Sequence, residues 1–302
     1  MLQEYIISDS GKQVVRDKEQ DAINAIKSME DIALSKHPDG YYVCDSGGKD
    51  SLVLCDLFLR SGVKCDFHHN FTTCDHPITN KYVRARKMEI EVLGYSYEIH
   101  FPTYKGEPTS MFKLIPLKGL PTQLRRWCCE ILKEYGGIGR MIATGVRWAE
   151  SVKRKNNRAQ YEAITPKIND KVFLNNDNDF RRALEVCPTY NKLALNPIIN
   201  WTDEEVWEYI RKYELKYNPL YDMGYKRVGC VGCPLTSHNK QDLEDNPKFY
   251  DAYYKFCEKY LETRSDHYFK NAKEMMDWWL RITPASPCVR LHGRKGFYHQ
   301  EL

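Results

Sequence analysis

Apolar and polar residues follow two different periods along the first two thirds of the chain. Short apolar runs rich in Val, Ile, Tyr and Phe are bounded by Gly, Pro or Asp, as is typical of buried strands. Segments between them repeat their apolar residues at helical spacing. Strands are predicted over residues 41–44, 63–71, 95–101, 140–145 and 193–199. This alternation predicts an α/β fold with a doubly wound, mostly parallel sheet of five strands, followed by a C-terminal helical region.

The predicted helices have recognisable boundaries. Residues 17–36 are expected to form one amphipathic helix, with Ile23 and Ile26 near one face. Thr202 and Glu205 have the spacing of a capping box, which marks a helix start at residue 203. Further helices are predicted over 52–59, 81–93, 203–213, 249–260 and 275–281.

The turn after the first predicted strand carries two adjacent glycines. It reads Ser46-Gly47-Gly48-Lys49-Asp50-Ser51 and leads directly into an apolar helix. Glycines let the backbone bend and approach a ligand, and the N–H groups of a helix start favour an anion. In parallel sheets, ligands bind beyond the carboxyl ends of the strands, where this turn would lie. A phosphate site is therefore predicted, although an ordinary strand-to-helix turn is the alternative, and the glycine spacing is not that of a Walker A loop.

Cysteines form two further patterns. Cys128 and Cys129 are adjacent, and Cys230 and Cys233 follow with a C-x-x-C spacing. Four thiolates suit either tetrahedral zinc or a [4Fe–4S] cluster. Neighbouring side chains diverge, so an adjacent pair reaches different irons of a wide cluster more easily than one small ion. The spacing favours the cluster, with structural zinc and unligated thiols as alternatives. The 11 cysteines, without a signal-like N-terminus, indicate a reducing compartment.

The segment 125–158 concentrates positive charge, with nine basic and three acidic residues. Such a run is usually a solvated surface, but here it flanks the other motifs and predicts a face for an anionic ligand. The whole chain of 302 residues has a net charge of only +4, from 45 basic and 41 acidic residues, which is too mild to imply nucleic-acid binding. A hydrophobic content of 42% without a membrane-length apolar run predicts a cytoplasmic, globular protein.

A small group of histidines and one aspartate is a second candidate for a metal site. His68 and His69 end the second predicted strand, and Asp75 and His76 follow in a polar turn. Their spacing matches no standard ligand pattern. They are interpreted as solvated strand-end or loop residues rather than as ligands.

Several of these motifs together resemble the phosphoadenosine phosphosulfate (PAPS) reductase family. The hexapeptide 46–51 resembles the pyrophosphate loop of the adenine-nucleotide alpha-hydrolase superfamily, which includes this family and the N-type ATP pyrophosphatases. The Cys-Cys-x-x-x-Lys pattern at 128–133, paired with the distant C-x-x-C, is similar to the cluster-binding pattern of adenosine phosphosulfate (APS) reductases. Gly145-x-Arg147 resembles the family's arginine loop, and the passage 196–233 is similar nearly end to end.

The resemblance implies roles for individual residues. An adenine nucleotide would lie on the carboxyl edge of the sheet, with Asp50 as the carboxylate on the magnesium side. Lys133 matches the family lysine that links cluster and substrate electrostatics, and Asp75 and Thr79 are weaker substrate-side candidates. The implied catalytic residues are Lys49, Asp50, Arg147 and Lys133. The implied nucleotide-binding residues are Ser46, Gly47, Gly48, Lys49, Asp50, Ser51, Arg147, Glu150, Ser151 and Arg154.

Two chemistries occur at such a site in the resembled superfamily. ATP pyrophosphatases cleave between the α and β phosphates with magnesium, whereas the reductases attack an activated sulfate with a cysteine in a Glu-Cys-Gly-x-His tail. The sequence has no such segment, and its one late cysteine, Cys288, lacks the neighbouring Glu and Gly. We therefore expect an ATP pyrophosphatase with a cluster that serves sulfur transfer, similar to the ATP-hydrolysing component of DNA phosphorothioation. APS or PAPS reduction and a non-catalytic nucleotide-sensing module are the alternatives.

Domain organisation and partners follow from the same patterns. We expect three parts along the chain. They are an N-terminal helical segment (1–39), a nucleotide-binding PAPS-reductase-like domain (40–235) with an insertion at 159–190, and a C-terminal helical region with a tail (236–302). The expected partners are an adenine nucleotide, a sulfur donor protein resembling a cysteine desulfurase, and a nucleic-acid acceptor. A homo-oligomer is a further expectation.

Overall fold

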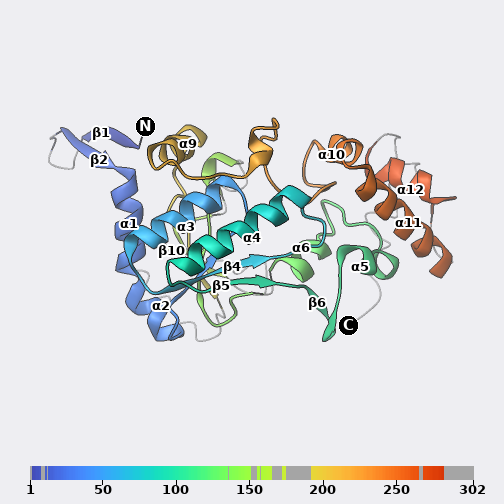
Figure 1. Ribbon diagram of the computed structural model, residues 1–302, viewed down its shortest axis with the longest axis horizontal. Helices are drawn as coiled ribbons and strands as arrows, with labels where there is room; N and C mark the ends of the chain where they lie inside the picture. The colour runs from blue at the N-terminus through green and yellow to red at the C-terminus, as the bar shows by residue number, and fades with distance from the viewer. Residues whose placement is uncertain are drawn as a thin grey trace. The chain divides into compact units, whose positions relative to one another are not determined.

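The computed structural model describes most of the chain and divides it into two compact units. The described residues are 2–7, 11, 13–134, 136–150, 155–156, 158–164, 172–174, 192–264 and 268–281. The first unit, here the sheet unit, consists of Met1–Asn70, Pro77–His100 and Gly136–Val228. The second, here the helical unit, consists of Phe71–His76, Phe101–Tyr135 and Gly229–Leu302. The chain therefore enters the helical unit three times (Figure 1).

The sheet unit is built on a seven-stranded sheet with the order β10-β9-β11-β8-β3-β4-β5. Its five parallel strands are β3 (Tyr41–Cys44), β4 (Cys65–Asn70), β5 (Tyr97–His100), β8 (Met141–Ala143) and β11 (Lys192–Leu195). Each lies within or beside a stretch that the apolar pattern marked as a strand. The predicted α/β fold with a parallel sheet is confirmed.

Two antiparallel strands correct the predicted number of five. β9 (Tyr161–Ile164) pairs with β11, and β10 (Val172–Leu174) pairs with β9. Both come from the stretch 159–190, which was read as an irregular insertion. The apolar pattern fails here because Glu162, in the middle of β9, is buried at 2% exposure. Its carboxylate accepts hydrogen bonds from Asn196 Nδ2 and from the backbone of Ala159, at 3.0 and 2.9 Å.

Helices cover one face of the sheet and bury its alternate residues. Tyr41 and Val43 of β3 belong to the main core, whereas Tyr42 between them points to the opposite face, as the pleat of a strand requires. α3 (Lys49–Ser61) and α4 (Pro77–Val92) both contribute buried residues to the main core. α9 (Asp203–Lys212) packs in the same core and begins at the predicted capping box, which is confirmed.

The N-terminal segment differs from its prediction in two ways. A hairpin of β1 (Gln3–Ile7) and β2 (Gln13–Asp17) precedes the helices, although residues 1–39 were expected to be helical. Its apolar side chains Tyr5 and Ile7 are exposed, so burial produced no strand pattern there. The single helix expected over 17–36 is two helices, α1 (Lys18–Ser28) and α2 (Glu30–Lys36), because the chain leaves helical geometry at Met29.

The helical unit has its own apolar core. Its helices are α5 (Met111–Lys118), α6 (Trp127–Leu132), α10 (Asn239–Asp245), α11 (Pro247–Thr263) and α12 (Ala272–Trp279). A short hairpin joins β6 (Thr103–Tyr104) to β7 (Glu107–Pro108). Tyr253 of α11 and Trp279 of α12 pack with ring centroids 4.9 Å apart in the buried centre. The predicted helices 249–260 and 275–281 are confirmed. None of the helices in the described ranges combines the length and apolar character that crossing a membrane requires.

Candidate functional site

The diglycine turn lies at the carboxyl end of β3 and leads into α3. Gly47 has a φ of +75°, a conformation that L side chains rarely adopt. A Cβ at this position would lie 2.9 Å from Thr79 Cγ2, so the turn has no room for a side chain. Gly48 forms the N-cap of α3 without a side-chain cap. The turn therefore presents backbone at a helix start, the geometry that suits a phosphate.

The buried carboxylate of Asp45 holds this turn through hydrogen bonds. One of its carboxylate oxygens accepts hydrogen bonds from Gly47 N and Ser51 Oγ, both at 2.9 Å. The other oxygen accepts from Arg86 Nε at 2.8 Å and from Tyr97 OH at 3.0 Å. Burial would raise the pKa of Asp45, but the guanidinium of Arg86 and the hydrogen bonds lower it to about 2. The carboxylate is thus a fixed negative anchor for the loop.

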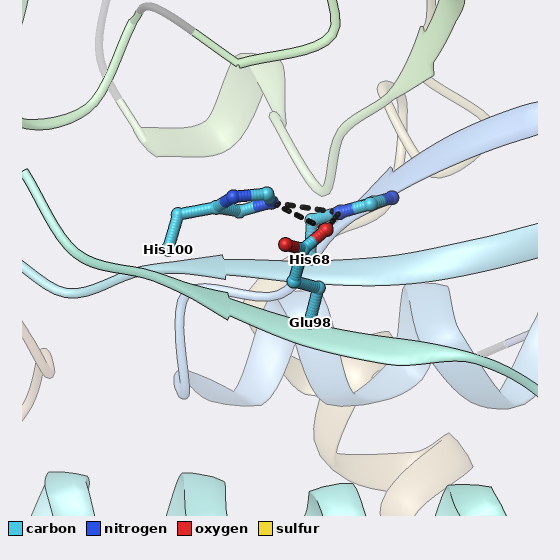
Figure 2. Close-up of side chains that lie close together, drawn as sticks. All are labelled: His68, Glu98 and His100. Carbon is cyan, nitrogen blue, oxygen red and sulfur yellow. Dashed lines mark hydrogen bonds and ion pairs between the residues drawn. The ribbon is translucent and has the colours of Figure 1, made fainter.

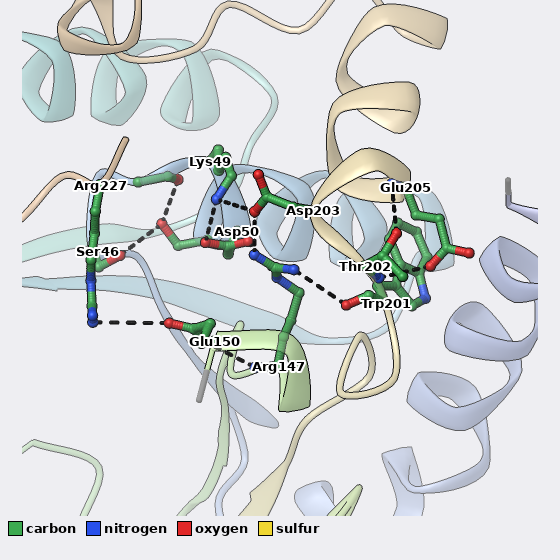
Figure 3. Close-up of polar contacts among 12 residues, drawn as sticks. Ser46, Lys49, Asp50, Arg147, Glu150, Trp201, Thr202, Asp203, Glu205 and Arg227 are labelled. Atoms are coloured by element: carbon green, nitrogen blue, oxygen red, sulfur yellow. Dashed lines mark hydrogen bonds and ion pairs between the residues drawn. The ribbon is translucent and has the colours of Figure 1, made fainter. Parts of the chain in front are cut away.

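Four charged side chains form a network beside the turn (Figure 3). Arg147 Nε lies 2.6 Å from Asp50 Oδ1, and a terminal nitrogen of Arg147 lies 2.8 Å from Asp203 Oδ1. Lys49 Nζ lies 2.9 Å from the same oxygen of Asp203 and 3.4 Å from Asp50 Oδ2. The two cations are nearly buried, with exposures of 5% for Lys49 and 2% for Arg147. The side chain of Asp203 is 55% exposed, so the network opens to solvent on its acidic side.

Arg147 is held in place by contacts beyond this network. A terminal nitrogen donates to the carbonyl of Trp201 at 3.2 Å, and its backbone N–H donates to Glu150 at 3.1 Å. Burial would lower the pKa of Arg147, but the carboxylates of Asp50 and Asp203 outweigh it and raise the pKa. The guanidinium is therefore permanently charged and oriented toward the diglycine turn.

Residues from a distant part of the sequence complete the loop. η2 (Pro219–Tyr221) places the hydroxyl of Tyr221 2.9 Å from Lys49 N, from which it accepts a hydrogen bond. Asn218 Nδ2 donates to Gly47 O and to Thr79 Oγ1, both at 3.1 Å. Thr79, predicted as a substrate-side residue, is buried and bonded to Asn218 beside the turn. Asn218 and Tyr221 fall within the passage 196–233 that resembles the family.

The cysteine pair lies in the helical unit, at the start of α6. Arg126 donates a hydrogen bond to Cys129 Sγ at 3.4 Å. The neighbouring thiol of Cys128, Arg126 and Lys133 together lower the pKa of Cys129 to about 5 against the effect of burial. Cys128 has a raised pKa, first because of its hydrogen bond with Cys129, and the charges of Cys230 and Cys233 contribute as well. The four predicted thiols are therefore neighbours in space.

The C-x-x-C turn is joined to the segment 71–76 of the same unit. Val231 N donates to Cys74 O at 2.8 Å, and Cys230 forms an isolated β-bridge with Asp75. A hydrogen bond with Cys74 and the charge of Lys133 bring the pKa of Cys230 down to about 6, although burial opposes the shift. Cys230 in turn raises the pKa of Lys133. Cys74 beside Cys230 is a fifth thiol, which the sequence patterns did not single out.

Zinc and cluster make different demands on the spacing of these sulfurs. A single tetrahedral zinc with Zn–S bonds of about 2.3 Å needs sulfurs roughly 3.8 Å apart. Among the described residues, one set of three metal-ligating groups lies within 4.8 Å of one another, and it consists of His68, Glu98 and His100. No three of the four thiols are therefore that close to one another. The chemistry of four cysteines in one unit fits a [4Fe–4S] cluster, with zinc as the alternative.

The remaining predicted residues have other protein contacts or lie outside the described residues. The carboxylate of Asp75 accepts a hydrogen bond from the backbone N–H of Thr72 at 2.7 Å and is buried. Ser46 and Ser51 bond to each other through their hydroxyl groups at 3.1 Å. Ser151, Arg154 and Cys288 lie outside the described residues.

The fold and the site together define an α/β protein with a diglycine turn at a helix start and a group of four cysteine thiols. Residues 41–236 match the family model described as the phosphoadenosine phosphosulfate reductase domain. The chain belongs to this family, which confirms the resemblance seen in the sequence.

Individual relatives agree with this assignment. An adenosine 5'-phosphosulfate reductase from Anoxybacillus flavithermus is 31% identical over 206 residues, which cover 68% of this chain and 77% of the relative. One from Staphylococcus haemolyticus is 25% identical over 223 residues, covering 74% of this chain and 82% of the relative.

Among solved structures, a PAPS reductase from Candida auris matches with a TM-score of 0.44 and 19% identity, covering 69% of this chain and 87% of the other. The U34-tRNA thiolase NcsA from Methanococcus maripaludis, solved with its [4Fe-4S] cluster, matches with a TM-score of 0.44 and 13% identity. The match covers 95% of this chain and 87% of the thiolase chain.

Proposed function

We propose that the protein is an adenine-nucleotide-dependent enzyme of sulfur chemistry that cleaves ATP between its α and β phosphates. The observation that carries this proposal is the pair of buried cations, Lys49 and Arg147, beside the diglycine turn. Guanidinium and ammonium groups at a helix start are the combination that polyphosphates require. The family membership supports a nucleotide as the ligand.

The charge network can exchange partners when a polyphosphate binds. Its two cations and two carboxylates balance one another in the arrangement described above. Phosphate oxygens would take over Lys49 and Arg147, which releases the carboxylates of Asp50 and Asp203. Hard carboxylate oxygens together with substrate phosphates form the usual coordination of Mg²⁺. Asp50 and Asp203 would therefore hold Mg²⁺, which when bound supplies charge neutralisation at the phosphate oxygens.

The catalytic role of the chain's own residues follows from this exchange. Arg147, oriented by Trp201 and Glu150, would bind the phosphate oxygens that gain charge as the bond between the α and β phosphates breaks. Lys49 would act as the second cation, and the backbone of Gly47 and Gly48 would let the phosphates approach closely. The acceptor would supply the nucleophile that forms the new bond to the α phosphorus, so that AMP passes to the acceptor while the site stabilises the leaving pyrophosphate.

The four thiols would hold a [4Fe–4S] cluster in the helical unit. Cys128, Cys129, Cys230 and Cys233 are the proposed ligands, and zinc remains the alternative occupant. The cluster, when bound, supplies a site that carries sulfur or electrons. Lys133 and Arg126 place positive charge beside the thiolates, which favours their deprotonated, ligating form. The proposed acceptor is a nucleic acid or a small molecule, with sulfur delivered by a protein resembling a cysteine desulfurase.

The test uses protein purified without oxygen, with its iron content measured. ATP and Mg²⁺ are added with candidate acceptors, and released pyrophosphate is quantified. Arg147→Ala should abolish release, whereas Lys216→Ala, a surface lysine of the same unit with 85% side-chain exposure, should not change it. The absence of pyrophosphate with every acceptor would overturn the proposal, and tight ATP binding without turnover would favour a nucleotide-sensing module.

A second candidate is the reduction of APS or PAPS to sulfite. The relatives named adenosine 5'-phosphosulfate reductase favour it. This reaction needs a thiol that attacks the sulfur of the activated sulfate, and Cys288 is the candidate in the sequence. Sulfite release from either compound in the presence of thioredoxin, abolished by Cys288→Ser, would establish this reading in place of ATP cleavage.

A further inference from the structure

Three metal-ligating side chains meet on the face of the sheet opposite the main core. His68 of β4 and Glu98 and His100 of β5 come from neighbouring parallel strands, where His68 is paired in register with Glu98 (Figure 2). Alternate residues of a strand point to the same side, so Glu98 and His100 share a face. Their ligand atoms all lie within 4.8 Å of one another. This group is separate from the nucleotide site and from the four thiols.

The donor atoms of the three side chains lie within 4 Å of one another. His68 Nδ1 lies 2.8 Å from His100 Nε2. The Glu98 carboxylate lies 3.7 Å from His100 Nε2 and 3.9 Å from His68 Nδ1. Both distances to the carboxylate are too long for hydrogen bonds. Ligands bound to one zinc at about 2.0–2.2 Å stand roughly 3–3.5 Å apart, so shifts of about half an ångström would complete the site.

A second carboxylate orients His68 in the manner of a metal-binding histidine. Asp66 Oδ1 lies 2.8 Å from His68 Nε2, and Arg140 holds both oxygens of Asp66 at 2.7 Å. The Asp66 carboxylate thus lies on the Nε2 side of the ring, while Nδ1 faces His100 and Glu98. Carboxylate–histidine–metal arrangements of this kind fix the tautomer of a ligand. Tyr42 adds rigidity because its ring stacks on His68 at 3.6 Å with an interplanar angle of 1°.

The exposure of the three side chains increases toward solvent. The side chain of His68, on β4, is 6% exposed. The side chains of His100 and Glu98, on the edge strand β5, are 21% and 63% exposed. The inner ligand is thus preorganised, whereas the outer side leaves a coordination position for water. Two imidazoles and one carboxylate select borderline transition metals such as Zn²⁺ or Co²⁺, in contrast to the oxygen-only sets of Mg²⁺ and the thiolates of a cluster.

We propose that His68, His100 and Glu98 bind one divalent transition-metal ion of the Zn²⁺ class, which fastens the edge strand β5 to β4. The ion replaces the proton shared by the two imidazoles and brings the Glu98 carboxylate into its coordination shell. One water completes the coordination on the solvent side.

The experiment uses the cluster-loaded protein, so that the cysteines are occupied, and Co²⁺ as a spectroscopic probe. We expect one Co²⁺ per chain, with the visible bands of nitrogen and oxygen ligands and without the intense thiolate charge-transfer band. His100→Asn and Glu98→Gln should each lower the Co²⁺ affinity about tenfold or more, with the iron content unchanged. Both variants change the edge strand and leave the stacked His68 intact.

His37→Asn is the matched control. His37 is another exposed histidine of the sheet unit, and its Nδ1 lies 3.6 Å from a carboxylate oxygen of Asp39. This variant should bind Co²⁺ like the wild type. Zn²⁺ should also raise the melting temperature of the wild type and of His37→Asn, but not of the two site variants. Equal Co²⁺ affinity in His100→Asn and Glu98→Gln, or a thiolate spectrum in the wild type, would show that the histidines form a hydrogen-bonded pair and no metal site.

Discussion

Arg147 and Asp50 are 97 residues apart in the sequence, yet Arg147 Nε lies 2.6 Å from Asp50 Oδ1. This contact joins the first turn of α3, which follows the diglycine turn, to the resembled arginine loop. Because Arg147 is almost fully buried, its charge is directed at the turn instead of being screened by water. The relationship brings two separate sequence motifs together in the site that is proposed to bind the nucleotide.

Arg147→Lys tests whether the forked geometry of this site matters as well as its charge. A lysine keeps the positive charge but cannot bridge Asp50 and Asp203 or bind phosphate oxygens in pairs. We expect the catalytic efficiency of pyrophosphate release to fall by about 100-fold, the usual loss for one transition-state donor. Arg60→Lys is the control, because Arg60 forms a surface pair with Asp56. Activity within about twofold of wild type in Arg147→Lys would contradict the role given to the guanidinium.

Gly47→Ala tests the need for bare backbone in the turn. An alanine there combines a φ of +75° with a Cβ only 2.9 Å from Thr79 Cγ2, so both strain and a clash are expected. Nucleotide affinity should drop strongly, and the free energy of unfolding by about 1–3 kcal/mol. Gly62→Ala is the matched control, since Gly62 has a φ of +71° with nothing within 4 Å of its Cβ position. It should destabilise the protein by strain alone and leave isothermal-titration affinities for ATP unchanged; equal affinity losses in both variants would argue against a specific turn.

The sheet and the motifs could be predicted from the sequence because their signals are local. Strands buried on both sides, such as β3, appear as continuous apolar runs, and the diglycine turn stands directly after one of them. The four cysteines were found from spacing alone, and the structure gathers them in one unit.

The parts that were missed depend on contacts between remote residues. Tyr221 reaches Lys49 N across 172 residues, and Asp203 meets Arg147 across 56. A tyrosine and a helix-start aspartate carry no pattern that reveals such partners. Asp45 was overlooked although it directly precedes Ser46, because a single acidic residue at a strand end is common. The group of His68, Glu98 and His100 has no signal in the sequence, because the parallel pairing of β4 and β5, and not residue spacing, brings the three together.

Asp45→Asn tests the buried anchor of the turn and predicts a pH dependence. The pKa of Asp45 is about 2 in the folded protein, below its ordinary value of 3.8. A lowered folded pKa stabilises the protein above the unfolded pKa, and this contribution is lost as the pH falls from about 4 to 2. The difference of nearly two units corresponds to about 2 kcal/mol.

Urea unfolding at several pH values measures this contribution. At pH 7 the variant should lose about 3–5 kcal/mol, because Arg86 is left as an unpaired buried charge. The difference in the free energy of unfolding between wild type and variant should become smaller below pH 4. Asp21→Asn, which alters a surface pair with Arg16, is the control and should change stability by less than about 1 kcal/mol. A gap that stays constant from pH 7 to pH 2 would show that Asp45 does not carry this charge.

Replacing single cysteines tests which thiols hold the cluster. Cys128→Ser, Cys129→Ser, Cys230→Ser or Cys233→Ser should each remove most of the iron and the visible absorption, since a hydroxyl is a poor substitute for a thiolate ligand. Cys257→Ala should retain both, because this buried cysteine has a pKa raised to about 12 and remains a protonated core residue. Full iron content in any of the four serine variants would remove that residue from the ligand set.

The hydroxyl of Tyr221 accepts a hydrogen bond from the backbone N–H of Lys49, at the start of α3, which is a group that a phosphate could use. It accepts the hydrogen bond of Lys49 N at 2.9 Å, so a phosphate bound at this position must displace it. Tyr221→Phe removes the competing acceptor and leaves the N–H exposed to the ligand. The free energy of unfolding without ligand should decrease by about 1 kcal/mol, the net value of one hydrogen bond. ATP affinity should increase about fivefold for the same reason, because the free state loses a bond that the bound state does not have.

Tyr217→Phe removes a hydroxyl bonded to Asp222 at 2.8 Å on the surface and should change neither quantity. Weaker ATP binding in Tyr221→Phe would mean that the hydroxyl contacts the nucleotide itself instead of holding its place.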